Sequence, residues 1–68
     1  MYKVSFDFPY GKTWLKSFFV DDRHSHAIII PEFTSDPDDA LKYTDKTQAE
    51  NDGKFYAGKY GYEVVKVQ

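Results

Sequence analysis

The chain has 68 residues, a net charge of −2 and no cysteine, and its aromatic residues are six Phe, six Tyr and one Trp. A chain this short builds one core, so we expect a single domain over residues 1–68, without a disulfide framework or a thiolate metal site. The aliphatic run at 27–30 is far below the roughly 20 residues that span a bilayer, and the N-terminus lacks a signal-peptide pattern. We therefore expect a cytoplasmic protein with no membrane partner.

Two strands are predicted at the start of the chain. Residues 2–8 alternate apolar and polar side chains, the period of a strand with one buried face. Pro9 and Gly11 predict a hairpin turn that leads into a second strand over 13–20. This second segment alternates imperfectly, which indicates either a β-bulge or partial cover on both of its faces.

A third strand is predicted at 27–30, after a polar loop over 21–26. Its three consecutive isoleucines favour a central or doubly covered position, and Pro31 is expected to end it. Residues 31–39 are rich in Pro, Ser, Thr and Asp, so we expect a surface loop there, anchored by Phe33. Within it, Ser35 or Asp36 could cap a brief helical turn at 37–41.

The remaining elements are a short strand at 40–43, a helix at about 46–59 and a last strand at 62–67. Thr44 or Asp45 is the expected helix cap, and Gly61 is expected to follow its C-terminus. The helix stripe that should face the sheet consists of Ala49, Gly53, Tyr56, Ala57 and Tyr60. This order of four strands, helix and strand predicts an α+β fold, a mostly antiparallel twisted sheet of four to five strands with one main C-terminal helix on one face.

Neither catalysis nor a cofactor is predicted. The loop at 21–26 is the one cluster that resembles a metal site or an acid–base site, with His24, His26 and Asp22 as the candidate ligands. A solvated loop explains these residues more simply, because no third anchoring element accompanies them. Ser25 between the histidines lacks the oxyanion hole and the pocket that a hydrolase needs. We expect a protein that is not an enzyme.

Charge disfavours nucleic acid as a partner. Residues 32–52 hold seven acidic side chains against two lysines, and the chain has a single arginine. Nucleic-acid affinity comes largely from basic side chains that neutralise phosphates. Aromatic rings on a sheet can nonetheless stack unpaired bases, so a single-stranded nucleic-acid binder is the alternative function. The rings that could do so are Tyr2, Phe6, Trp14 and Phe18.

An interaction module that binds an unknown protein partner is the leading hypothesis. A domain of this size cannot hide every ring, and exposed aromatics are common at interfaces. Phe55 falls outside the helix stripe, so it points away from the sheet unless the helix face is rotated or the 31–39 loop covers it. The aromatic candidates for partner contact are Phe55, Phe33, Tyr10 and Trp14. Asp36, Asp38 and Asp39 are acidic candidates that equally suit turn formation. A homodimer is also left open.

The segments 40–50 and 60–67 carry a resemblance. They contain a short strand, a capped helix start and a closing valine-rich strand: Ala40-Leu41-Lys42-Tyr43, Thr44-Asp45-Lys46-Thr47-Gln48-Ala49-Glu50 and Tyr60-Gly61-Tyr62-Glu63-Val64-Val65-Lys66-Val67. This pattern resembles the ending of small uncharacterised accessory proteins from phages and prophages of Gram-positive bacteria. The resemblance covers less than half of the chain and contributes no catalytic residues. It implies a cytoplasmic accessory protein that binds a host protein.

Overall fold

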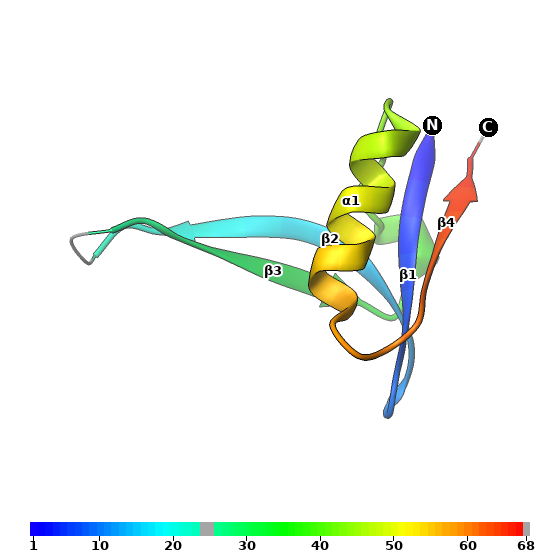
Figure 1. Ribbon diagram of the computed structural model, residues 1–68, viewed down its shortest axis with the longest axis horizontal. Coiled ribbons are helices and arrows are strands. Elements are labelled where there is room, and N and C mark those ends of the chain that lie inside the picture. The colour runs from blue at the N-terminus through cyan, green and yellow to red at the C-terminus, as the bar shows by residue number, and fades with distance from the viewer. Residues whose placement is uncertain (24–25, 68) are drawn as a thin grey trace.

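The computed structural model describes residues 1–23 and 26–67, which form a four-stranded sheet and one α-helix (Figure 1). The strands lie in the order β3-β2-β1-β4, and each pairs antiparallel with its neighbour. The elements are β1 (Tyr2–Phe8), β2 (Gly11–Asp21), β3 (Ile28–Thr34), the short 3₁₀ helix η1 (Pro37–Asp39), α1 (Lys46–Ala57) and β4 (Tyr62–Lys66). The predicted α+β class, with one helix packed on a mostly antiparallel sheet, is confirmed.

The first hairpin follows its sequence pattern. Val4 and Phe6 of β1 are fully buried beneath α1, and Ser5 between them points to the other face, where it lies opposite Trp14. Gly11 begins β2 with a φ of 122°, a conformation that favours glycine at this turn. Ser5 is only 2% exposed, so both faces of β1 are covered at this point, and the expectation that its polar face lies in water was wrong here.

A β-bulge interrupts β2 at Lys16. Leu15 lies opposite Phe33, but Ser17 already lies opposite Glu32, so Lys16 is the extra residue. Because side chains alternate along a strand, one extra residue reverses which face each later side chain occupies. The imperfect alternation of this segment is thus explained by a bulge, one of its two predicted causes.

The predicted position of the third strand was wrong. β3 is an edge strand that continues through Pro31 to Thr34, and its three isoleucines are exposed. Proline lacks a backbone N–H, so a strand accepts it at an edge, where its nitrogen can face away from the neighbouring strand. Phe33, expected in a loop, lies in β3 and packs edge-on against Phe6 and Phe8.

The connection from β3 to α1 contacts both β2 and β1. Asp36 was one of the two predicted caps of this turn. It caps η1 by accepting a hydrogen bond from the Asp38 N–H at 2.9 Å. Leu41 N–H donates to the Leu15 carbonyl at 2.8 Å, which fastens the connection to β2. The predicted strand at 40–43 is reduced to a single antiparallel bridge between Tyr43 and Tyr2.

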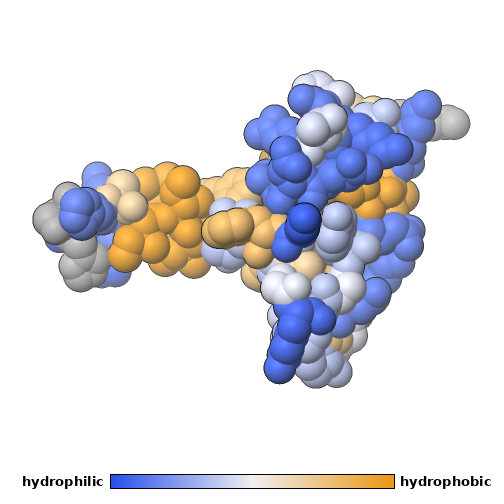
Figure 2. Space-filling view, viewed as in Figure 1, coloured by the Kyte–Doolittle hydropathy of each residue, from blue (hydrophilic) through white to orange (hydrophobic). Residues whose placement is uncertain are grey.

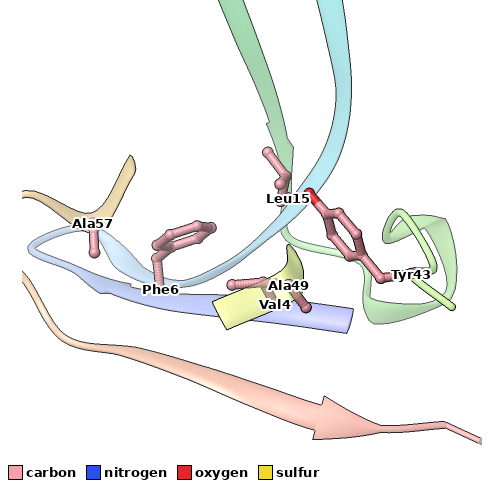
Figure 3. Close-up of a cluster of buried hydrophobic side chains, with 6 residues drawn as sticks. All are labelled: Val4, Phe6, Leu15, Tyr43, Ala49 and Ala57. Atoms are coloured by element: carbon pink, nitrogen blue, oxygen red, sulfur yellow. The ribbon is translucent and has the colours of Figure 1, made fainter. Parts of the chain in front are cut away.

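Helix α1 packs on β1 and β4. Asp45 caps it by accepting a hydrogen bond from the Thr47 N–H at 2.9 Å. The buried helix residues are Ala49, Gly53 and Ala57. Figure 3 shows Ala49 and Ala57 in the core that the helix forms with the sheet. The helix ends at Ala57 rather than 59, because Gly58 takes a φ of 60° and breaks it before Gly61. No helix within the described ranges has the length and apolar character to cross a membrane.

Candidate functional site

An apolar arm projects from the body of the molecule. We call the outer parts of β2 and β3, residues 17–21 and 28–32, the β2–β3 arm; they extend past the helix to one side (Figure 1). Figure 2 shows a contiguous hydrophobic surface along it. Its five most exposed apolar side chains are Phe19 at 54%, Val20 at 56%, Ile28 at 48%, Ile29 at 58% and Ile30 at 42%.

The arm is apolar on both of its faces. Cross-strand partners share a face, and Phe18 packs against Tyr56 of α1 with ring centroids 5.5 Å apart. This contact defines the helix-side face, which carries Phe18, Val20, Ile29 and Pro31. The back face carries Ser17, Phe19, Asp21, Ile28, Ile30 and Glu32. The bulge at Lys16 produces this division, since without it Ser17 and Phe19 would face the helix.

The polar groups of the arm sit at the two ends of the back face. Ser17 Oγ donates to Glu32 Oε1 at 2.8 Å at the inner end. At the outer end Asp21 accepts from the Arg23 guanidinium at 2.7 and 2.9 Å. These side-chain hydrogen bonds, together with one from the Arg23 backbone N–H, lower the pKa of Asp21. Asp21 is paired with Arg23, Glu32 holds a hydrogen bond from Ser17, and an apolar strip of Phe19, Ile28 and Ile30 lies between them.

A hollow of about 280 Å³ lies where the helix-side face meets α1. Its lining consists of Phe18, Val20, Ile29, Asp52 and Tyr56. Asp52 Oδ2 accepts a hydrogen bond from the Tyr43 hydroxyl at 2.6 Å. Burial and this hydrogen bond to a carboxylate both raise the pKa of Tyr43, because each disfavours the phenolate. The hollow is thus largely apolar, with one carboxylate that already holds a hydrogen bond.

The predicted aromatic candidates do not form one patch. Phe55 is 76% exposed and packs edge-on against Tyr56, so of the alternatives left open for this ring the exposed position is the one observed. Tyr10 is 75% exposed at the β1–β2 turn, where it contacts Phe8. Phe33 is half-buried in the body, and Trp14 is only 8% exposed beneath Lys3 and Lys12. Of the four, Phe55 alone adjoins a ring that lines the hollow.

Of the three acidic candidates for partner contact, Asp36 has a structural role, and the fold reveals no role for Asp38 and Asp39. Asp36 caps η1, while Asp38 and Asp39 are exposed within its single turn. Of the acidic side chains between 32 and 52, Glu32 and Asp52 are the two that reach the arm or its hollow.

The structure describes two of the three candidate metal ligands. Asp22 and His26 are exposed in the loop that joins β2 to β3, and His24 lies outside the described residues. Within residues 1–23 and 26–67, no three His, Cys, Asp or Glu side chains cluster in a way that could hold a metal ion.

Sequence reasoning missed the arm. Its signals were Phe18-Phe19-Val20 and Ile28-Ile29-Ile30, two apolar runs without alternation. Such runs are typical of strands buried on both faces, so they predicted a covered strand. In the fold, α1 covers β1 and β4 and leaves the outer parts of β2 and β3 uncovered among the described residues.

Fold and surface together define a small α+β protein with a projecting two-stranded apolar ribbon. No protein-family model matches the chain, and comparison with curated proteins and with solved structures gave no significant match.

Proposed function

We propose that this chain is a non-catalytic protein-interaction module whose contact element is the β2–β3 arm. One observation carries the proposal: five large apolar side chains, each 42–58% exposed, gather on an element that projects from the fold. Contiguous apolar surfaces of this kind mark sites where another macromolecule binds. An isolated two-stranded ribbon is also only marginally stable in water, so a partner that covers it would stabilise it.

The partner under this proposal is a protein. The central part of the arm offers side chains that bury well against other apolar groups and has no free basic cluster for phosphates. The resemblance to phage accessory proteins adds the finer proposal that the partner is a host protein met in the cytoplasm. The single-stranded nucleic-acid alternative gains no support from geometry, because Phe6 and Trp14 are buried and Phe18 packs on Tyr56.

The test is affinity capture with variants that change the arm alone. The tagged chain is incubated with lysate of the cells that carry its gene, with and without nuclease, in parallel with a Phe19→Thr/Ile30→Thr double variant. Threonine keeps strand propensity while removing apolar area from an exposed cross-strand pair. Tyr10→Thr, at an exposed ring away from the arm, is the matched control.

The expected result is a protein that the wild type and Tyr10→Thr recover and the arm variant loses. The recovered protein, once purified, should bind the wild type directly in calorimetry. Equal recovery by the arm variant would refute the back face of the arm as the surface that contacts the captured protein. Recovery that depends on omitting nuclease would favour the nucleic-acid alternative.

A further inference from the structure

The chain exposes more surface than a compact monomer of its mass. Its accessible surface is 4922 Å², whereas a monomer of 7.9 kDa is expected to expose about 4400 Å². Its radius of gyration is 12.3 Å, against about 11 Å for a compact chain of this length. The excess of roughly 500 Å² is a large part of the roughly 800 Å² that each partner contributes to a stable interface.

The two faces of the β2–β3 arm differ in the kind of partner surface that each can bind. The back face has a narrow apolar strip between two polar pairs, Ser17 with Glu32 and Asp21 with Arg23. The helix-side face runs from Val20 and Ile29 to Phe18 and then to the rings of Tyr56 and Phe55. The charged residue beside it is Asp52 of α1, which lines the hollow. The hollow between this face and α1 adds a concave part to the same surface.

We propose that the helix-side face of the arm is covered by the same face of a second copy of this chain, related by a two-fold axis. This inference rests on the proposed function of the arm as a contact element. A two-fold interface brings the same patch together from both copies, so the patch must complement itself. The arm's own part of this face meets this condition, because Phe18, Val20, Ile29 and Pro31 carry no charge and each copy presents apolar area to the other.

Packing the two arms in this way changes the environment of the hollow. The Val20–Ile29 pair of each copy lies against that of the other, and the two hollows join into one apolar core between the arms. The carboxylate of Asp52 lies at the margin of this core and keeps its hydrogen bond from Tyr43. The back face stays on the outside of the dimer, where Phe19, Ile28 and Ile30 remain available to a different protein.

The first test is the mass in solution of three purified chains, measured by sedimentation equilibrium across a wide concentration range. The wild type should have the mass of two chains. Val20→Lys, which places two like charges in the interface, should weaken the dimer by roughly 30-fold or more, the loss expected when an interface hot spot is removed. Phe19→Lys is the matched control, since it is the neighbouring residue of similar exposure on the back face, and it should remain dimeric.

A second test does not depend on a destabilising change. The natural chain has no cysteine, so a single introduced thiol reports only on contact between copies. Ile29→Cys should form a disulfide between two chains under mild oxidation, whereas Ile30→Cys, on the back face, should not. Circular dichroism of every variant would verify that it is folded.

A wild type with the mass of one chain at every concentration would overturn the inference, as would a Val20→Lys variant that dimerises like the wild type. Disulfide formation by Ile30→Cys in preference to Ile29→Cys would overturn the assignment to the helix-side face. A monomeric wild type whose Phe19→Thr/Ile30→Thr variant still loses a captured protein would refute the dimer and leave the proposed function standing.

Discussion

The rings of Phe18 and Tyr56 lie 5.5 Å apart, centroid to centroid, at the point where the arm leaves the body of the molecule. No other aromatic pair found in the described residues joins β2 to α1. This contact therefore holds the root of the arm against the helix and sets one side of the hollow.

Tyr56→Ala should loosen the arm. The half-buried ring supplies both apolar burial and an aromatic pair, so we expect a loss of about 1–2 kcal/mol in the free energy of unfolding. Hydrogen exchange at Ile28–Ile30 should accelerate more than exchange in β1, because the arm would open locally. Phe55→Ala is the control, since a ring that is 76% exposed should change stability by less than about 0.5 kcal/mol. Equal acceleration in β1 and in the arm would contradict a local role for the contact.

Gly53→Ala should destabilise the fold even though alanine is the better helix former. A Cβ at this position would lie 2.6 Å from Tyr62 Cδ2 and 3.0 Å from Val4 Cγ1, and Val4 is fully buried. Overpacking of this kind costs about 1–3 kcal/mol, against a gain of roughly 1 kcal/mol in helix propensity. We expect a net loss of about 1 kcal/mol, which lowers Tm by roughly 4–8 °C in a domain of this size.

The control for Gly53→Ala is Asn51→Ala, an exposed position of the same helix. It gains propensity without steric cost, so its Tm should be unchanged or slightly raised. A Gly53→Ala variant more stable than Asn51→Ala would show that α1 does not need its close approach to β4 and β1.

Tyr43 should make stability depend on alkaline pH. Its folded pKa is raised, first by burial and then by the hydrogen bond to Asp52, so the fold favours the protonated phenol. The resulting stabilisation is complete below the ordinary tyrosine pKa of about 10 and declines as pH rises above it. Tyr43→Phe removes the hydrogen bond to a carboxylate, which should cost about 1.5–3 kcal/mol at neutral pH.

The difference in the free energy of unfolding between wild type and Tyr43→Phe should therefore shrink as pH rises beyond about 10. Urea unfolding of both proteins at neutral and alkaline pH measures this difference. Tyr10→Phe serves as the control, because Tyr10 is 75% exposed and loss of its hydroxyl should change the free energy of unfolding little. A constant difference between wild type and Tyr43→Phe would contradict the predicted linkage.

Asp45→Ala should remove the N-cap of α1. Asp45 Oδ1 accepts from the Thr47 N–H at 2.9 Å, and loss of such a cap typically costs about 1 kcal/mol. Asp45→Asn should restore most of this stability, because asparagine caps nearly as well. Thermal unfolding of wild type and both variants measures these changes in stability. An Asp45→Asn variant as unstable as Asp45→Ala would indicate that the charge of Asp45, not its hydrogen bond, stabilises the helix.

The parts of the fold that local patterns determine could be predicted. The strand at 2–8, the bulge as one explanation of 13–20, the Asp45 cap and the α+β class all follow from alternation, turn residues and capping chemistry. The helix end could not be placed, because Gly58 and Gly61 both suit a helix terminus and local sequence does not rank them.

The candidate site could not be predicted for a different reason. Ile28–Ile30 carry the composition of a buried strand, and sequence alone does not tell whether the cover comes from the same chain or from another. That distinction depends on where α1 lies, and α1 packs on β1 and β4 rather than over β3. The exposed position of Phe55 was equally undetermined, since it required knowing which residues the 31–39 segment contacts.

Pro31 limits how assemblies of this chain can grow. β3 is a free edge of the sheet, and an unprotected edge strand invites another sheet to add to it, one copy after another. Proline in the middle of β3 removes one donor from that edge and interrupts a continuous ladder. Under the proposed dimer, contacts between chains therefore involve side chains on the faces of the arm, and the apolar edge strand does not serve as a template for open-ended fibres.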